Sequence, residues 1–468
     1  MTAPSPSARR KIVEDMLTTA DGRRALADEL ERVLFREVLD AEWPATKDLD
    51  CGGYLTDLDR RWRPAGPQSK SLEFIARHMR AYARAAIAYP GRGYDEAARH
   101  GFAFLTEHMW DAANGGFYTV VDRRGAPLEQ GRKHPHGHLY VVDGAIAMAP
   151  LVGESLAKDW AMRAFAWLED VAWDVEHGGY WGYFERDNTR IRVEGKKPWE
   201  GFDWIGSPLE TKDFNVLGDA LATVNGLATT GWANVEGAKT GVGDRAAARL
   251  IWHTDLFLDR LLPLWPVTPF LYTRDWRMAP DILRAGQVFQ VIAALLEAAA
   301  NTGRWDEAMA GCCRLRDTAE RFFAHRDGGF VFAKSVYEWP LRGADLTARE
   351  RSWWVQTEAA RGGLLLALLK PEDAGRRAAF ARQWVFIEQQ LIDPRFHGFY
   401  ESAEQGHRWR RHWLGRAPSA LNKLNMWKDA SHETHLLMDA SDWLRHGPDC
   451  HQAGRIPQTK AQRETAPV

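Results

Sequence analysis

Apolar residues recur at helical spacing through most of the chain, and the helices that they predict come in pairs. Stretches such as LFREVLDAEW and AMRAFAWLEDVAW place apolar side chains three or four positions apart, as in an amphipathic helix. The last predicted helix, 427–444, has its partner near the N-terminus, at 20–44. The other predicted pairs are 70–89 with 94–110, 138–152 with 155–172, 212–230 with 244–262, 282–302 with 305–325, and 350–370 with 373–392.

A short phrase recurs between the pairs: an Asp, a few polar residues, Gly-Gly, an aromatic residue and a strand-like stretch. Gly-Gly between short aromatic runs predicts a β-hairpin. One interval, between Gly179 and Gly329, is more than twice as long as the others and should hide a degenerate copy; TPFLYTRDWRM from Thr268 is the best candidate. The clear copies are DLDCGGYLTDLDRRW from Asp48, WDAANGGFYTVVDRRG from Trp110, WDVEHGGYWGYFERDN from Trp173, HRDGGFVFAKS from His325 and DPRFHGFYESAEQG from Asp393.

Helices in six pairs, of which one pair joins the two ends of the chain, favour a closed ring over an open solenoid. We therefore predict an all-α protein, an (α/α)6 barrel with short β-hairpin loops at the active-site end. It should form a single domain over 1–445, followed by a polar, poorly ordered tail over 446–468. If each hairpin leads into an inner helix, the helix N-termini meet at one mouth, where ligand sites form readily.

Composition narrows the function further. A net charge of -2 over 468 residues gives no general electrostatic reason to bind nucleic acid or an anionic membrane. The chain has no apolar run long enough to span a membrane and no apolar segment after its basic N-terminus, and its 4 cysteines lack zinc-type spacing. We expect a cytoplasmic protein, with a homodimer as the default oligomeric state.

Candidate chemistry is concentrated in the first turns of the predicted inner helices. The 22 tryptophans are mostly architecture, but a few lie in these turns, where an indole stacks well on a sugar ring. The candidate site residues are Arg77, Tyr140, Asn215, Asp219, Gln287, Trp353, Trp354, Glu358, Trp427, Lys428 and His432.

Three motifs resemble the N-acylglucosamine 2-epimerase superfamily, which includes cellobiose 2-epimerases, mannose isomerases and sulfoquinovose isomerases. They are W-K-x-x-x-H at Trp427–His432, W-W-x-Q-x-E-A at Trp353–Ala359 and K-x-x-N at Lys212–Asn215, and the motif order agrees over roughly 50–445. The resemblance implies a barrel that moves a proton at C2 of an open-chain sugar through a cis-enediolate. It also implies that no cofactor or metal is used and that two histidines usually serve as general acid and base.

Individual residues match the superfamily motifs. By this resemblance His432 is the C-terminal catalytic histidine, Arg77 holds the enediolate oxygens and Asn215 contacts the substrate. Trp427 and one or both of Trp353 and Trp354 line the sugar site, although two adjacent tryptophans on one helix should not both face the lumen.

Two positions depart from the superfamily pattern. The histidine that usually follows the asparagine by four residues is Asp219 here, and the histidine and glutamate of a G-H-x-x-E motif become Gln287 and Gln290. Glutamine cannot accept and return a proton at neutral pH. This loss affects epimerisation, which needs a proton on the opposite face, more than isomerisation. Asp219 is a candidate second base if apolar walls raise its pKa.

Several residues have a second interpretation. His134, His136 and His138 are spaced like metal ligands but lack a nearby carboxylate in the sequence, so a solvated loop or substrate contacts are preferred. Arg77 suits either a structural ion pair or, with Lys428, stabilisation of the enediolate.

Two rival functions use the same barrel. A glycoside hydrolase would rely on carboxylates such as Asp213, Asp219 and Glu358. A lyase would use His432 or Tyr140 as its base. A catalytically silent sugar-binding protein would keep Arg77, Asn215 and the tryptophan lining.

Overall fold

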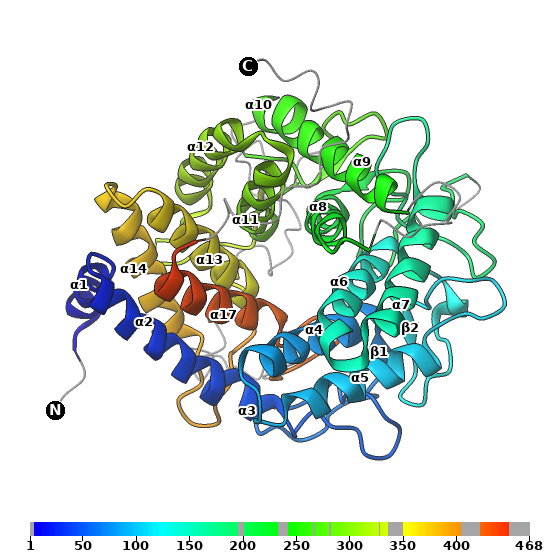
Figure 1. Ribbon diagram of the computed structural model, residues 1–468, viewed down its shortest axis with the longest axis horizontal. Coiled ribbons are helices and arrows are strands. Elements are labelled where there is room, and N and C mark those ends of the chain that lie inside the picture. Colours follow the sequence, from blue (N-terminus) through cyan, green and yellow to red (C-terminus); the bar gives the residue numbers. More distant parts are fainter. Residues whose placement is uncertain are drawn as a thin grey trace, which may run out of the picture.

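The inner wall of the molecule is a ring of helices around a central axis (Figure 1). The computed structural model describes residues 4–194, 201–232, 242–264, 267–279, 282–326, 328–335, 350–403 and 422–448. The inner helices are α4 (Leu72–Ala88), α6 (Pro135–Val152), α8 (Phe214–Thr229), α11 (Ala285–Thr302), α13 (Trp353–Leu369) and α17 (Ser431–His446).

Each inner helix packs against an outer helix that is its neighbour in sequence, except at the point of closure. There α17 packs against α2 (Ala20–Val33), so the two ends of the chain complete one pair. The predicted helix pairs and the (α/α)6 barrel are thus confirmed. The other outer helices are α5 (Tyr94–His108), α7 (Glu154–Trp167), α9 (Val242–Asp255), α12 (Trp305–Phe323) and α14 (Ala374–Gln390).

Shorter elements complete the outer layer. α1 (Pro6–Met16) lies against α14, and α3 (Asp40–Glu42) and α10 (Leu262–Leu264) are single turns. Three outer helices, α2, α7 and α9, continue into π-helical turns, and a 3-10 turn precedes α6. These turns are η1 (Leu34–Leu39), η3 (Leu168–Ala172), η5 (Leu256–Leu261) and η2 (Glu129–Gly131).

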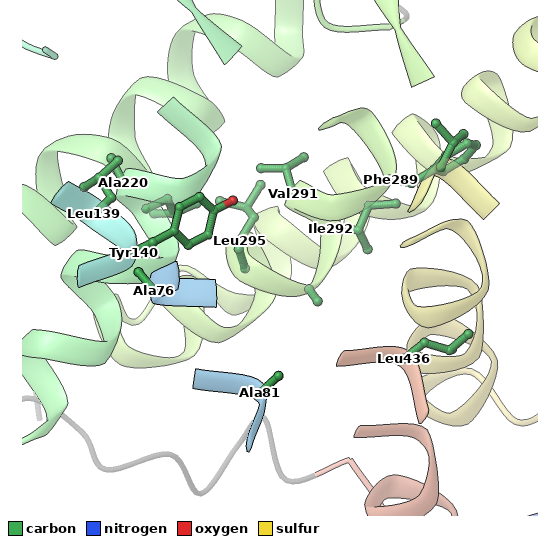
Figure 2. Packing of buried hydrophobic residues seen from close by; sticks show 14 of the residues in the cluster. Ala76, Ala81, Leu139, Tyr140, Ala220, Phe289, Val291, Ile292, Leu295 and Leu436 are labelled. Atoms are coloured by element: carbon green, nitrogen blue, oxygen red, sulfur yellow. The ribbon is translucent and has the colours of Figure 1, made fainter. Parts of the chain in front are cut away.

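Side chains at the mouth cap the first turns of α4, α6 and α8. The Ser71 hydroxyl accepts a hydrogen bond from the Phe74 amide at the start of α4, and Asp213 does the same for Val216 at the start of α8. Apolar residues cover most of the circumference of these helices, as expected for helices buried on both sides. Figure 2 shows the resulting core, in which Ala76, Leu139, Ile292 and other residues of different inner helices lie close together.

The repeated Gly-Gly phrases form hairpins, as predicted. In each clear copy the residue before the turn pairs with the aromatic after it, as in Trp110 with Phe117. Gly116 has a φ of +80°, and a Cβ there would lie 2.6 Å from the Trp167 ring, so this position requires glycine. The hairpins continue into three two-stranded antiparallel sheets among the described residues: β1 (Lys70–Ser71) with β2 (Val120–Val121), β3 (Lys212–Asp213) with β4 (Leu271–Tyr272), and β5 (Ile282–Arg284) with β6 (Ala333–Ser335).

The aspartate of the phrase ties neighbouring repeats together. Asp111, for example, is buried and forms ion pairs with Lys133 and Arg186. Lys133 stands just before the next inner helix, and Arg186 belongs to the next hairpin. Four copies share this arrangement: Asp48 with Lys70 and Arg123, Asp111 with Lys133 and Arg186, Asp174 with Lys212 and Arg274, and Asp393 with Lys423 and Arg60.

These clamps explain the phrase and close the ring at the mouth, because Arg60 belongs to the first hairpin and Asp393 to the last. The degenerate copy from Thr268 supplies the arginine of one clamp, Arg274, which is why its Arg-Asp-Trp is kept without the glycines.

Two further sequence predictions concern the C-terminal tail and the absence of a membrane-spanning helix. α17 extends to His446, one residue beyond the predicted domain end, and the rest of the predicted tail from position 449 lies outside the described residues. Within the described part of the chain, no helix combines the length and apolarity needed to cross a bilayer.

Candidate active site

A cavity of about 300 Å³ occupies the mouth of the barrel, at the N-terminal ends of the inner helices. It receives side chains from every inner helix and from the loops that precede them. Its lining residues are Arg77, His136, Tyr140, Ile205, Asn215, Asp219, Arg284, Gln287, Gln290, Phe332, Glu350, Ser352, Trp353, Trp354, Glu401, Trp427 and His432.

His432 stands in the first turn of α17 and is held from behind by Glu358 of α13. Its Nδ1 lies 2.7 Å from Glu358 Oε1, and the carboxylate is buried. The ring packs beside Trp354 at 5.4 Å between centroids. Because Nδ1 is engaged by the carboxylate, Nε2 is the nitrogen left to meet a ligand, as in histidines oriented for acid–base catalysis.

Glu358 does not line the cavity. It was predicted to bind substrate, but its carboxylate orients His432 instead.

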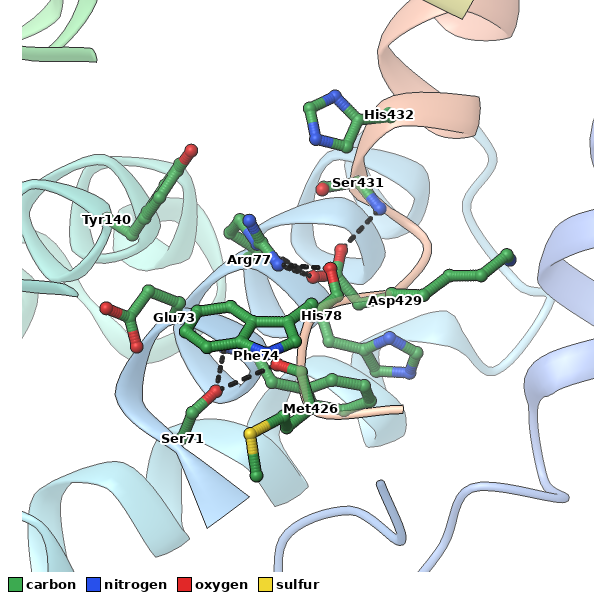
Figure 3. A network of polar contacts seen from close by, with 12 residues as sticks. Ser71, Glu73, Phe74, Arg77, His78, Tyr140, Met426, Asp429, Ser431 and His432 are labelled. Atoms are coloured by element: carbon green, nitrogen blue, oxygen red, sulfur yellow. Dashed lines mark hydrogen bonds and ion pairs between the residues drawn. The ribbon is translucent and has the colours of Figure 1, made fainter. Parts of the chain in front are cut away.

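Arg77 brings a fixed positive charge to the cavity. Its Nε donates to Asp429 Oδ2 at 2.7 Å and its Nη2 donates to the Trp427 carbonyl at 2.9 Å. The guanidinium also lies over the Tyr140 ring at 5.2 Å (Figure 3). The ion-pair interpretation of Arg77 is therefore confirmed, and the pair keeps the guanidinium facing the cavity. Its action on an enediolate stays a prediction.

Asp219 of α8 is the centre of a buried polar cluster across the barrel from α17. Its Oδ2 accepts hydrogen bonds from His136 Nε2 and from the Tyr140 hydroxyl, each at 2.8 Å. Its Oδ1 accepts one from Gln290 Nε2 at 2.9 Å. On the other side of the imidazole, Glu73 lies 3.7 Å from His136 Nδ1. The cluster thus places a histidine between two carboxylates.

This environment charges His136 and Asp219 as a pair. Burial alone would lower the pKa of His136, but the hydrogen bond to Asp219 and the nearby carboxylate of Glu73 outweigh it and raise this pKa to about 9. Burial alone would raise the pKa of Asp219, yet the bonds from His136 and Tyr140 hold it below its ordinary value. The expectation that apolar walls raise the pKa of Asp219 is wrong.

The three alternating histidines do not form a solvated loop, since all are buried and have protein partners. His134 lies 3.3 Å from Asp203, and His136 belongs to the Asp219 cluster. His138 accepts from the Phe117 amide at 2.8 Å and stacks on an indole, which makes it part of the scaffold. Among the residues that the structure describes, no group of His, Cys, Asp or Glu is arranged to hold a metal ion.

Two amide side chains meet in the wall of the cavity. Gln287 of α11 donates a hydrogen bond to the side-chain oxygen of Asn215 on α8. The remaining oxygen of Gln287 is buried without a hydrogen-bond partner. An amide acceptor in this state is satisfied when a ligand hydroxyl donates to it.

Aromatic rings form the outer part of the cavity. Trp353 and Trp354 both line it, although one of them was expected to belong to the core. Trp427 is 38% exposed and packs against Trp204 at 5.5 Å between ring centroids. Such a surface suits the apolar faces of a sugar.

Lys428 does not reach the cavity. Its Nζ donates to Glu433 at 3.1 Å, and both side chains are buried. The predicted contact of Lys428 with substrate or enediolate is wrong, because burial of its ammonium required a carboxylate partner within the protein.

Some cavity residues were missed in the sequence. Arg284, Glu350 and Ser352 lie within the few positions that precede an inner helix, and Ile205 lies on a hairpin. Proximity to the start of an inner helix was the available signal for the first three. His136 was noticed only as part of a triplet, because its partner Asp219 is 83 residues away.

Comparisons with known proteins agree with this architecture. The family model described as N-acylglucosamine 2-epimerase (GlcNAc 2-epimerase) matches residues 53–198. A cellobiose 2-epimerase from Dictyoglomus turgidum is 22% identical over 413 residues, which cover 85% of this chain and 93% of that protein. The chain is therefore similar to the N-acylglucosamine 2-epimerase superfamily, by the family model over residues 53–198 and by the cellobiose 2-epimerase over most of its length.

Solved structures of similar proteins share the fold. The cellobiose 2-epimerase from Spirochaeta thermophila has a TM-score of 0.75 at 22% identity, with 90% of this chain and 97% of that chain covered. A D-mannose isomerase has a TM-score of 0.69 at 16% identity, with 94% and 100% covered. The chain thus shares the barrel fold of these two proteins.

Proposed function

We propose that this protein is an aldose–ketose isomerase that acts on an open-chain sugar. It moves one proton between C1 and C2 through a cis-enediolate, with His432 as the general acid and base. The observation that carries the proposal is the pairing of His432 with Glu358 on one side of the cavity, while no free base stands across from it among the described lining residues.

His432 suits a proton shuttle between adjacent carbons. The proton removed from C2 of an aldose returns to C1 of the enediolate on the same face, so one base completes the reaction. Glu358 holds Nδ1, keeps the ring in one orientation and stabilises the imidazolium while it carries the proton.

Arg77 stabilises the other half of the reaction. A cis-enediolate places negative charge on the oxygens of C1 and C2, and a prepositioned guanidinium stabilises such charge without reorganisation. Asp429 and the Trp427 carbonyl hold the Arg77 side chain toward the cavity. The unpartnered oxygen of Gln287 is suited to accept a hydrogen bond from a sugar hydroxyl.

The opposite side of the cavity favours isomerisation over epimerisation. An epimerase works in both directions, so a group on the second face must act as a base in one of them. The Tyr140 hydroxyl is protonated, since burial and the charge of Asp219 raise its pKa well above 10. His136 is also protonated, and both oxygens of Asp219 accept hydrogen bonds.

The rival functions have less support. Inverting hydrolysis needs two carboxylates facing the glycosidic bond across the site. Glu358 lies behind His432, and Asp219 is neutralised by His136. A carbohydrate is the expected substrate class, since the similar proteins are named cellobiose 2-epimerase and D-mannose isomerase.

The test is to incubate the protein with mannose, glucose, fructose and several disaccharides in heavy water and to follow the products by NMR. The proposal predicts ketose from an aldose and partial deuterium at C1 of that ketose, because the His432 imidazolium exchanges some of its protons with heavy water during the transfer. Both are lost in His432→Asn. His177→Asn, a change in a hairpin outside the cavity, is the matched control and should retain activity. New reducing ends would indicate hydrolysis, and binding without exchange would indicate a silent protein; either result contradicts the proposal.

A further inference from the structure

A second cavity, of about 470 Å³, lies at the end of the barrel away from the active-site mouth. It is formed where α17 and α13 end and where α2 and α14 begin. We call it the basic pocket, after the residues that line it together with apolar side chains: Arg23, Arg24, Arg377, Arg445 and His446. The size is within the range of cavities that hold small metabolites.

The described charged residues that line the basic pocket are all basic. Basic side chains arrive from three separate segments, and no aspartate or glutamate is among its described lining residues. Arg445 is neutralised from outside by Asp28 and Glu31, at 2.7 and 2.6 Å. Arg24 pairs with Asp21 at the surface.

Arg23 and Arg377 differ from the other arginines of the pocket because, among the described residues, only backbone carbonyls accept their hydrogen bonds. Arg23 Nη1 donates to the Leu17 carbonyl at 3.4 Å, and Arg377 Nη1 donates to the Pro371 carbonyl. The Nε of Arg377 is buried and has no hydrogen-bond partner within the described part of the chain. A buried guanidinium N–H without an acceptor is costly, and an anion placed there would remove that cost.

The surrounding backbone and apolar wall add to the case. α2 begins beside the pocket, with Thr19 as its N-cap, so the positive end of a helix dipole adds to the arginine charge. Leu17, Trp443 and Leu444 are buried lining residues and offer an apolar wall next to the charged groups. A ligand that suits both surfaces carries an anionic group on an apolar or ring-shaped body.

We propose that the basic pocket binds the phosphate group of a small phosphate monoester, with Arg23 and Arg377 as its main ligands. Arginine matches the phosphate oxygens in geometry and stays charged at any physiological pH. The pocket lies at the far ends of α17 and α13, whose first turns carry His432 and Glu358. Binding there is independent of whether the protein is an isomerase.

The test is isothermal titration calorimetry of the full chain with phenyl phosphate and inorganic phosphate, and with phenol as the uncharged counterpart. We expect phenyl phosphate to bind best, because the apolar wall adds to the charge, and phenol not to bind. The double variant Arg23→Gln/Arg377→Gln should weaken phenyl phosphate by about tenfold or more. Arg163→Gln/Arg277→Gln removes the same charge from exposed surface pairs and should bind like the wild type.

Equal affinity in the two double variants would overturn the proposal, because binding would then depend on overall charge or on another cavity. Absence of phenyl phosphate binding to the wild type would overturn it as well. The single variant Arg377→Lys keeps the charge but loses the buried Nε, and it serves if the double variant does not fold. It should weaken binding, and unchanged affinity would contradict the assignment of Arg377.

Discussion

Removal of the His136 imidazole should change how the stability of the protein depends on pH. In the folded protein this ring lies between the carboxylates of Asp219 and Glu73, and its pKa is raised to about 9 from the ordinary 6.5. A raised pKa means that folding favours the protonated ring. The stabilisation is fully present below pH 6.5 and is lost as the pH rises through 9.

The size of the effect follows from the two pKa values. Between 6.5 and about 9 the stabilisation amounts to about 3 kcal/mol, at about 1.4 kcal/mol for each pH unit. A chain of this length has an unfolding entropy on the order of 1 kcal/mol per degree, so the change corresponds to about 3 °C in Tm. Differences between variants at the same pH isolate this contribution from other titrating groups.

The assay is differential scanning calorimetry of the wild type and of His136→Gln at several pH values from 6 to 10. The Tm gap between them should be largest at pH 6 and should shrink by about 3 °C toward pH 10. His253→Gln is the control, because burial lowers the pKa of that histidine to about 4 and it carries no charge in this range. A His136→Gln gap that stays constant with pH would refute the ion-pair assignment.

Three further changes test other parts of the structure. Glu358→Gln should lower kcat by about 10²–10⁴-fold with little change in KM, because the catalytic imidazole loses its orienting carboxylate. Asp111→Asn should lower the free energy of unfolding by about 3–5 kcal/mol, because Lys133 stays buried without its counter-charge; calorimetry should give less than about 1 kcal/mol for the exposed Asp159→Asn. Lys428→Met should leave KM for the sugar unchanged in steady-state kinetics, because this ammonium does not reach the cavity, and a higher KM would contradict that placement.

The helices and hairpins could be predicted because their signals are local. Periodicity over ten to twenty residues and Gly-Gly between aromatic residues are properties of short segments. Because the chain is built from repeats, each of these patterns occurs several times in the sequence. Closure of the ring followed from the pairing of the first and last helices. The ion-pair clamps could not be predicted, because Asp393 and its partner Arg60 are 333 residues apart. In the sequence, neither can be distinguished from a charged residue on the surface.

The location of the site could be predicted from the sequence better than the contacts of its individual side chains. Arg77, Asn215 and His432 face the cavity because the first turns of inner helices converge at one mouth. The directions of individual side chains depend on tertiary partners, so Lys428 and Glu358 were assigned to the cavity although both are directed elsewhere. The sign of a pKa shift likewise depends on what stands opposite the group in space.

The central claim is that one base on one face of the enediolate does the chemistry, and the configuration of the first product tests it most directly. The ketose on which the wild type turns over is incubated in heavy water, and the aldose formed is analysed by NMR before equilibrium. The account predicts a single configuration at C2, deuterium at that carbon, exchange of only one of the two hydrogens at C1 of the remaining ketose, and no reaction with His432→Asn. Both C2 epimers formed at comparable rates from the outset would contradict it, because a second group, such as protonated His136 or Tyr140, would then deliver a proton to the opposite face.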